Sequence, residues 1–172
     1  MNDVLKPIFD RRSIRAYEDQ PVPERTVRDL LEAAMAAPSA VAKDPWDFIT
    51  ITDSEMLKKV AEGLPNGKML GEAPLGIMVC GSLERAHDNE LSYMLQDCSA
   101  AIENILLAAS MLGLGACWLG VHPREDRVNH IRSLLDVPEQ VTPLAAITVG
   151  RPAETKEPRT RYDAGKVHAE GW

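Results

Sequence analysis

Three arginines and a serine stand within five residues near the N-terminus: Arg11, Arg12, Ser13 and Arg15. The guanidinium group of Arg is a rigid fork of donors that suits phosphate oxygens, and a serine hydroxyl adds one more donor. The chain as a whole is acidic, with a formal net charge of -7. This local concentration of cations indicates a site for a phosphate-bearing ligand. A basic turn that simply faces water is the alternative that these five residues leave open.

A second group of cations lies at the other end of the chain, from Arg151 to Trp172. This stretch holds Arg151, Lys156, Arg159, Arg161 and Lys166 but hardly any aliphatic residues. A segment of this composition cannot form a hydrophobic core of its own. We therefore expect it to be held by something else, either a partner subunit or a ligand.

Between the two basic groups, the apolar pattern predicts alternating helices and strands. Apolar residues at helical spacing predict helices near the start of the chain and over four later segments, and short apolar or β-branched runs predict strands. The helices are expected over 4–10, 24–37, 54–64, 91–112 and a stretch that begins at 122, and the strands over 46–52, 74–81, 115–121 and 141–149. The helix over 91–112 is apolar around most of its circumference, so it must be covered on more than one side.

Four short motifs occur in a fixed order along the chain. Arg11-Arg12-Ser13-Ile14-Arg15 is followed by Pro38-Ser39-Ala40 with Pro45-Trp46-Asp47-Phe48, by Gly113 to Gly120, and by Gly150-Arg151-Pro152 with Pro158 to Arg161. In this order and spacing, the motifs resemble those of the flavin-dependent nitroreductase family. The resemblance extends over nearly the whole chain, from Ile8 to Trp172.

The resemblance implies an α+β fold, the nitroreductase-like three-layer arrangement, with a central and mostly antiparallel sheet flanked by helices. It also implies an intertwined homodimer with two equivalent sites at the subunit interface. At 172 residues the chain is long enough for one domain with a sizeable core. We therefore expect a single nitroreductase-like domain over 1–172, in which 151–172 is a C-terminal extension that packs on the partner subunit.

The same resemblance assigns site residues for an FMN cofactor. Matched motif by motif, it implies Arg11, Ser13, Arg159 and Arg161 around the phosphate, Arg15 toward N1 and O2 of the ring, and Arg12 in side-chain or backbone contact. It further implies Pro38, Ser39 and Ala40 along the ring, given by the partner subunit, Asn66 near the pyrimidine edge, and the backbone of Leu119 and Gly120 near N5. Trp46 and Trp118 are expected in the core, because tryptophan buries well at the ends of strands.

In such a site the chemistry belongs to the cofactor, so no catalytic side chain is expected. The resemblance implies an NAD(P)H oxidoreductase in which NADH or NADPH gives a hydride to the flavin and leaves before a nitroaromatic, quinone or related electrophile enters, a ping-pong cycle. Two positions depart from the family pattern: Ala42 and Asp44 stand where an asparagine and a glutamine are usual. The substrate spectrum is therefore expected to differ.

Composition and residue spacing indicate which kinds of partner, membrane segment and metal site are not expected. The acidic balance disfavours nonspecific binding to nucleic acid or an anionic membrane surface. No apolar run approaches membrane-spanning length, and the N-terminus lacks a signal pattern, so a soluble, cytoplasmic protein is expected. Cys80, Cys98 and Cys117 have no metal-ligand or CxxC spacing and are expected to be buried free thiols, with no metal site.

Two other functions remain open from the sequence. One is a flavoprotein of the same fold with another reaction, such as dehalogenation or flavin modification. The other is a non-enzymatic module that binds flavin or another phosphate-bearing ligand. The sequence does not distinguish NADH from NADPH, identify the physiological acceptor, or show whether one or two electrons pass at a time.

Overall fold

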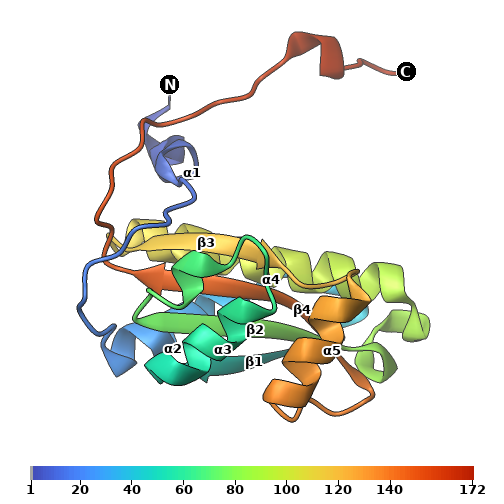
Figure 1. The fold of residues 1–172 in the computed structure, drawn as a ribbon. Helices are drawn as coiled ribbons and strands as arrows, with labels where there is room; N and C mark the ends of the chain where they lie inside the picture. The colour runs from blue at the N-terminus through green and yellow to red at the C-terminus, as the bar shows by residue number, and fades with distance from the viewer. Residues whose placement is uncertain (1) are drawn as a thin grey trace.

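A computed structural model describes residues 2–172 as one four-stranded sheet with helices on both of its faces (Figure 1). The strands are β1 (Trp46–Ile51), β2 (Leu75–Ser82), β3 (Gly115–Gly120) and β4 (Val141–Gly150), and the α-helices are α1 (Lys6–Asp10), α2 (Glu24–Met35), α3 (Ser54–Glu62), α4 (Leu91–Met111) and α5 (Glu125–Leu134). These bounds agree with the predicted segments to within a few residues. The helix expected to begin at His122 starts three residues later, at Glu125.

The sheet has the strand order β1-β2-β4-β3, and all three neighbouring pairs are antiparallel. This confirms the expected α+β class with a mostly antiparallel sheet. The pairing of β3 with β4 sets Gly115, the first residue of β3, opposite Gly150, the last residue of β4. The chain that enters β3 and the tail that leaves β4 therefore meet at one end of the sheet.

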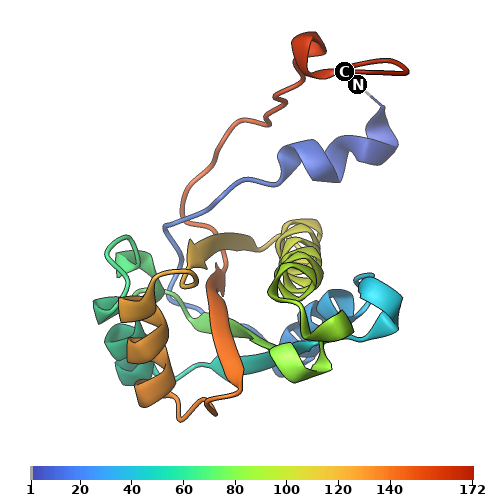
Figure 2. The same ribbon diagram turned by 90° about the vertical axis from the view of Figure 1, so that its right-hand side faces the viewer.

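Helices cover the two faces of the sheet in pairs, which gives the expected three layers (Figures 1 and 2). All eight residues of β2 are buried, and alternate side chains point to opposite faces because the period of a strand is two. Ile77 packs in the core cluster that holds residues of α2 and α4, whereas Met78 packs in the cluster that holds residues of α3 and α5. The apolar character of α4 follows from this arrangement, since it contacts α2 on one side and the sheet on the other.

The start of α3 and the burial of the cysteines agree with the sequence predictions. The side chain of Asp53 accepts a hydrogen bond from the amide of Met56 at 2.8 Å and thereby caps α3. Cys80, Cys98 and Cys117 are buried free thiols, as expected, and burial raises the pKa of Cys80 and of Cys98 to about 12. Trp46 is also buried, in the core next to β2.

The first helix and the tail stand off this body side by side (Figures 1 and 2). The tail beyond Arg159 is exposed throughout, including the large side chains of Tyr162 and Trp172. Its composition predicted that it would form no core by itself, and it forms none. Over residues 2–172, no helix combines the length and the hydrophobicity that crossing a membrane requires.

Candidate cofactor site

The first basic motif is fixed to the edge of the sheet by a short bridge to β3. Ser13 forms a parallel bridge with Ala116, and the amide of Ile14 donates to the carbonyl of Ala116 at 3.0 Å. Ile14 is buried, so the backbone between Arg12 and Arg15 is held against the sheet while the polar side chains on either side remain available.

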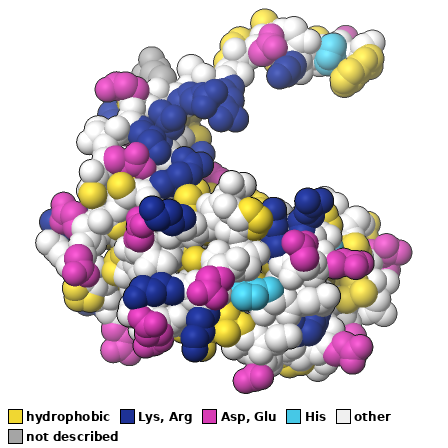
Figure 3. Space-filling model, in the orientation of Figure 1, with side chains coloured by type: hydrophobic (Ala, Val, Ile, Leu, Met, Phe, Trp, Pro, Cys, Tyr) yellow, Lys and Arg dark blue, Asp and Glu magenta, His cyan; other side chains and the backbone are white. Residues whose placement is uncertain are grey.

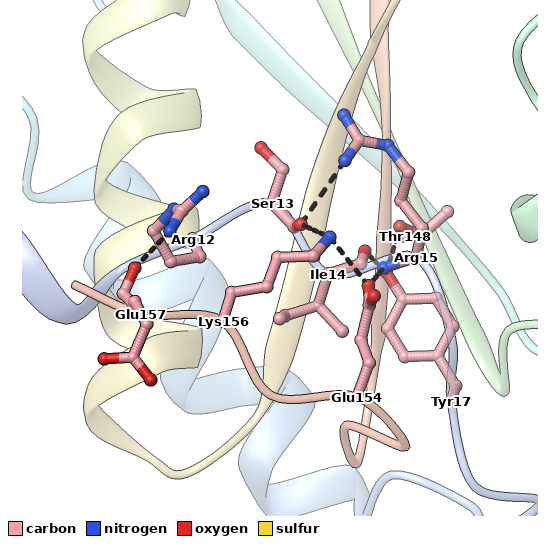
Figure 4. Close-up of polar contacts among 9 residues, drawn as sticks. All are labelled: Arg12, Ser13, Ile14, Arg15, Tyr17, Thr148, Glu154, Lys156 and Glu157. Carbon is pink, nitrogen blue, oxygen red and sulfur yellow. Dashed lines mark hydrogen bonds and ion pairs between the residues drawn. The ribbon is translucent and has the colours of Figure 1, made fainter. Parts of the chain in front are cut away.

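The start of the tail runs alongside this motif and is bonded to it repeatedly (Figure 4). The Lys156 ammonium donates to the carbonyl of Ser13 at 2.7 Å, and the Arg12 guanidinium donates to the carbonyl of Glu157. Farther along, the amide of Arg159 donates to the carbonyl of Phe9 at 3.0 Å. The two ends of the chain, about 140 residues apart in sequence, thus form one structural unit.

Cations from both ends line a single cavity of about 380 Å³, which we call the first cavity. Its lining residues are Ile8, Arg11, Arg12, Ser13, Arg15, Lys156, Arg159 and Arg161. Figure 3 shows the Lys and Arg side chains gathered where the tail leaves the body. Two of these cations are partly neutralised, since Arg11 lies 3.3 Å from a carboxylate oxygen of Glu103 in α4 and Lys156 lies 2.9 Å from one of Glu154. The remaining charge makes this cavity a suitable site for a phosphate group.

A second cavity of about 540 Å³ adjoins the first, and Arg15 lines both. The other residues of the second cavity are Leu64, Pro65, Asn66, Lys68, Met69, Cys117, Trp118, Leu119, Gly120 and Arg127. The predicted residues Asn66, Leu119 and Gly120 are therefore together in one place. A Cβ atom built on Gly120 would meet no atom within 4 Å, so space stays open directly above this backbone. A cavity whose wall combines apolar side chains and open backbone with a few polar groups fits a flat ring system.

The structure does not bring Pro38, Ser39 and Ala40 to either cavity. Their loop follows α2 and lies against α4, where the amide of Ala40 donates to Asp97 at 2.9 Å. Within one chain they cannot line the same cavity as Asn66 and Gly120, because the loop packs elsewhere. A place beside a ring for these residues stays a prediction that requires a second subunit.

Several lining residues were missed from the sequence. Lys156 belongs to the basic tail, but nothing in the sequence indicated that it would line the same cavity as Arg159 and Arg161. Lys68 and Arg127 looked like ordinary residues of solvated surfaces. The prediction that Trp118 belongs to the core is wrong: the residue is 40% exposed, because it lies on the outer strand of the sheet, and it is among the residues that line the second cavity.

Glu154 fastens the tail to the first motif by a charged contact (Figure 4). Its Oε1 accepts from the amide of Arg15 at 2.6 Å and from the Lys156 ammonium at 2.9 Å. The hydrogen bond from Lys156, followed by that from Arg15, lowers the pKa of this carboxyl below its ordinary value of 4.5. Nearby, burial raises the pKa of the Tyr17 phenol, which donates to the carbonyl of Ile14 and shares a hydrogen bond with Thr148.

Replacing Glu154 by Gln is expected to lower the free energy of unfolding by about 1 kcal/mol at pH 7, because a charge-assisted contact is lost. A carboxyl whose pKa is lowered by folding contributes stability above its unfolded pKa and loses that contribution as the pH falls through the folded pKa. The difference between wild type and variant should therefore shrink as the pH drops below 4.5. Urea unfolding at pH 7 and in the acid range measures it. Glu157→Gln is the matched control, since only the backbone carbonyl of Glu157 serves as an acceptor, and an equal loss in both variants would contradict the role of Glu154.

Together, the fold and the two cavities define a protein built to hold a phosphorylated ligand with a flat ring. The cations of the first cavity match a phosphate, the second cavity matches the ring, and Arg15 stands between them. Comparison with known proteins gives the family of this chain. The nitroreductase family matches this chain over residues 8–67 and 61–151, and the chain belongs to that family.

Individual relatives match this chain over nearly all of its length. A protein of Methanothermobacter thermautotrophicus, provisionally named NADH dehydrogenase/NAD(P)H nitroreductase, is 48% identical over 172 residues, which are 99% of this chain and 88% of the relative. An FMN reductase [NAD(P)H] of Bacillus subtilis is 32% identical over 185 residues, covering 95% of this chain and 72% of that protein. A provisionally named nitroreductase of Desulfovibrio desulfuricans, solved in complex with FMN, superposes with a TM-score of 0.85 at 33% identity over 100% of this chain and 99% of its own.

Proposed function

We propose that this protein is an FMN-dependent NAD(P)H oxidoreductase that reduces small electrophilic acceptors such as nitroaromatics or quinones. The observation that carries the proposal is the meeting of cations from both chain ends around one cavity, which adjoins at Arg15 a second cavity with a partly apolar wall. The relatives with NAD(P)H nitroreductase and FMN reductase names, and the FMN complex of a similar fold, support the choice of cofactor and donor.

The residues of this chain would hold the two parts of FMN separately. Arg11, Arg12, Ser13, Lys156, Arg159 and Arg161 would bind the phosphate, with Arg15 between phosphate and ring. The ring would lie in the second cavity, near Asn66 and over the backbone of Leu119 and Gly120. Gly120 has no side chain, so the space above its backbone is open. Bound FMN would supply the redox chemistry, so that NADH or NADPH and then the acceptor react in turn.

This chemistry requires no side chain of the protein to act as a general acid or base. The thiol of Cys117 lines the second cavity, but burial raises its pKa, which keeps it neutral and unreactive near pH 7. The protein's part is to bind the cofactor, orient the ring and present a backbone donor at its edge. This division of labour fits a site whose polar groups are nearly all cations for anion binding.

The proposal is tested by the absorption spectrum of the purified protein. We expect it to take up FMN, to be yellow, and to bleach when NADH or NADPH is added without oxygen. Reoxidation on addition of a nitroaromatic or a quinone would identify the acceptor class. A protein that binds FMN but is not bleached by either nicotinamide would favour a binding module, and one that takes up no FMN would overturn the proposal.

We further propose that the active form is a homodimer in which the tail, 151–172, packs on the partner subunit. Large apolar side chains are exposed at both ends of the chain, among them Val4, Tyr162 and Trp172, and Met111 is exposed at the end of α4. Their burial against a second copy would stabilise a dimer by the hydrophobic effect. A partner would also be needed to bring Pro38, Ser39 and Ala40 to the ring.

Sedimentation at micromolar concentration should show a dimer for the full chain. Deleting 163–172 removes Val167 and Trp172 but keeps Arg159 and Arg161, so this variant is expected to shift toward monomer. A monomeric full-length protein would contradict the shared site.

A further inference from the structure

The wall of the second cavity carries three cations, Arg15, Lys68 and Arg127, and among residues 2–172 no acidic residue lines it. This is unusual in a chain with a net charge of -7. The rest of the wall is largely apolar and includes Leu64, Met69 and Leu119. A molecule that fits this cavity should therefore have a flat apolar body and a negatively charged edge.

Arg127 is the cation that is held most firmly in this wall. It lies in the first turn of α5, and its Nη1 donates to the carbonyl of Gly120 at 2.8 Å. Its Nε is buried and has no hydrogen-bond partner within residues 2–172. Its neighbours Glu125 and Asp126 are exposed, and neither forms an ion pair with it. A partly desolvated guanidinium group thus faces the cavity with one neutral acceptor and no counter-charge.

The other two cations of the cavity are less suited to receive a separate anion. Arg15 is shared with the first cavity, where the phosphate of FMN is proposed to bind. Lys68 has a side chain that is 92% exposed and lies 3.6 Å from a carboxylate oxygen of Glu72. Its charge is therefore already balanced by water and by Glu72. Of the three cations, Arg127 is therefore the one whose positive charge has no carboxylate partner within residues 2–172. A buried guanidinium donor without an acceptor is energetically costly.

We propose that the acceptor which enters the second cavity is an aromatic molecule with an anionic substituent, and that Arg127 binds this substituent. The apolar ring of the acceptor would contact the apolar part of the wall, which includes Met69, and its carboxylate or similar group would accept hydrogen bonds from the guanidinium. Gly120 has a second role here, since its carbonyl fixes the direction of the Arg127 side chain. The inference rests on the proposed function, because it assumes that FMN shares the cavity.

The test uses the FMN-loaded protein and two nitro compounds that differ in charge, 4-nitrobenzoate and neutral 4-nitrobenzamide. Their dissociation constants are measured from the change in the flavin spectrum, with no NADH or NADPH present. We expect wild type to prefer the anion, and Arg127→Gln to reduce this preference roughly tenfold, the typical worth of a charged hydrogen bond. Arg124→Gln, an exposed residue just before the same helix and outside the cavity, removes the same charge and should keep the preference.

A wild-type measurement makes the test independent of how the variant folds. Because the preference is electrostatic, it should weaken as NaCl is raised, and Arg127→Lys should retain part of it. Equal binding of the two compounds by wild type, or an Arg127→Gln protein with an unchanged preference, would overturn the inference while FMN uptake and reduction by NAD(P)H stand. Wild type that takes up no FMN would overturn the proposed function and this inference with it.

Discussion

Replacing Arg15 by Met is expected to raise the dissociation constant for FMN about 10- to 100-fold, because hydrogen bonds to a charged group contribute roughly 1.5–3 kcal/mol. Arg15 is the lining residue common to both cavities, so its charge would act on both the phosphate and the ring of FMN bound as proposed. The substitution keeps the backbone contact to the fold, since Glu154 bonds the amide of Arg15 and not its side chain. Fluorescence titration of apoprotein with FMN measures the change.

Arg28→Met provides the matched control for this experiment. Arg28 is exposed on α2 and pairs with Glu32 of the same helix at 2.8 Å, outside both cavities. The Arg28→Met substitution removes the same charge from the protein as Arg15→Met does, and it should leave the affinity for FMN unchanged. If Arg15→Met bound FMN as tightly as this control does, the assignment of the first motif to the cofactor would have to be abandoned.

Replacing Gly115 by Ala is expected to lower the free energy of unfolding by about 1–3 kcal/mol, the usual cost of inserting a methyl group into a packed site. A Cβ at this position would stand 2.7 Å from Cβ of Ile14 and 2.6 Å from its Cγ2. These atoms are not the free end of a flexible side chain, so the whole first motif must move. FMN affinity should fall together with stability, because Ser13 and Arg15 flank Ile14.

Urea unfolding and FMN titration of the same preparation measure both effects. Gly171→Ala is the control, since a Cβ there would meet no atom within 4 Å. A Gly115→Ala protein with wild-type stability and affinity would show that the motif does not depend on its close approach to β3. Loss of affinity without loss of stability would indicate that the motif shifts while the sheet stays intact.

The sequence by itself determined the local elements and the ingredients of the site. The continuous apolar run of β2 predicts a buried strand, the long apolar pattern of α4 predicts a helix covered on two sides, and Asp53 predicts the start of α3. These signals are read within one segment, and burial of apolar surface enforces them wherever the segment packs. The two basic groups and their likeness to the nitroreductase motifs could likewise be recognised without a structure.

Only the tertiary structure decided which residues meet. The register of β3 against β4 sets Gly115 opposite Gly150, and this pairing brings the tail beside the first motif so that Lys156 joins the first cavity. The fold also leaves Trp118 half exposed on the outer strand, and it holds the Pro38 loop against α4, away from the second cavity. Arg127 could not be singled out from the sequence, because its role depends on the hydrogen bond to the carbonyl of Gly120 and on its having no ion pair with a carboxylate within residues 2–172. Such contacts join residues far apart in the chain, and the balance of packing that selects them belongs to the whole fold.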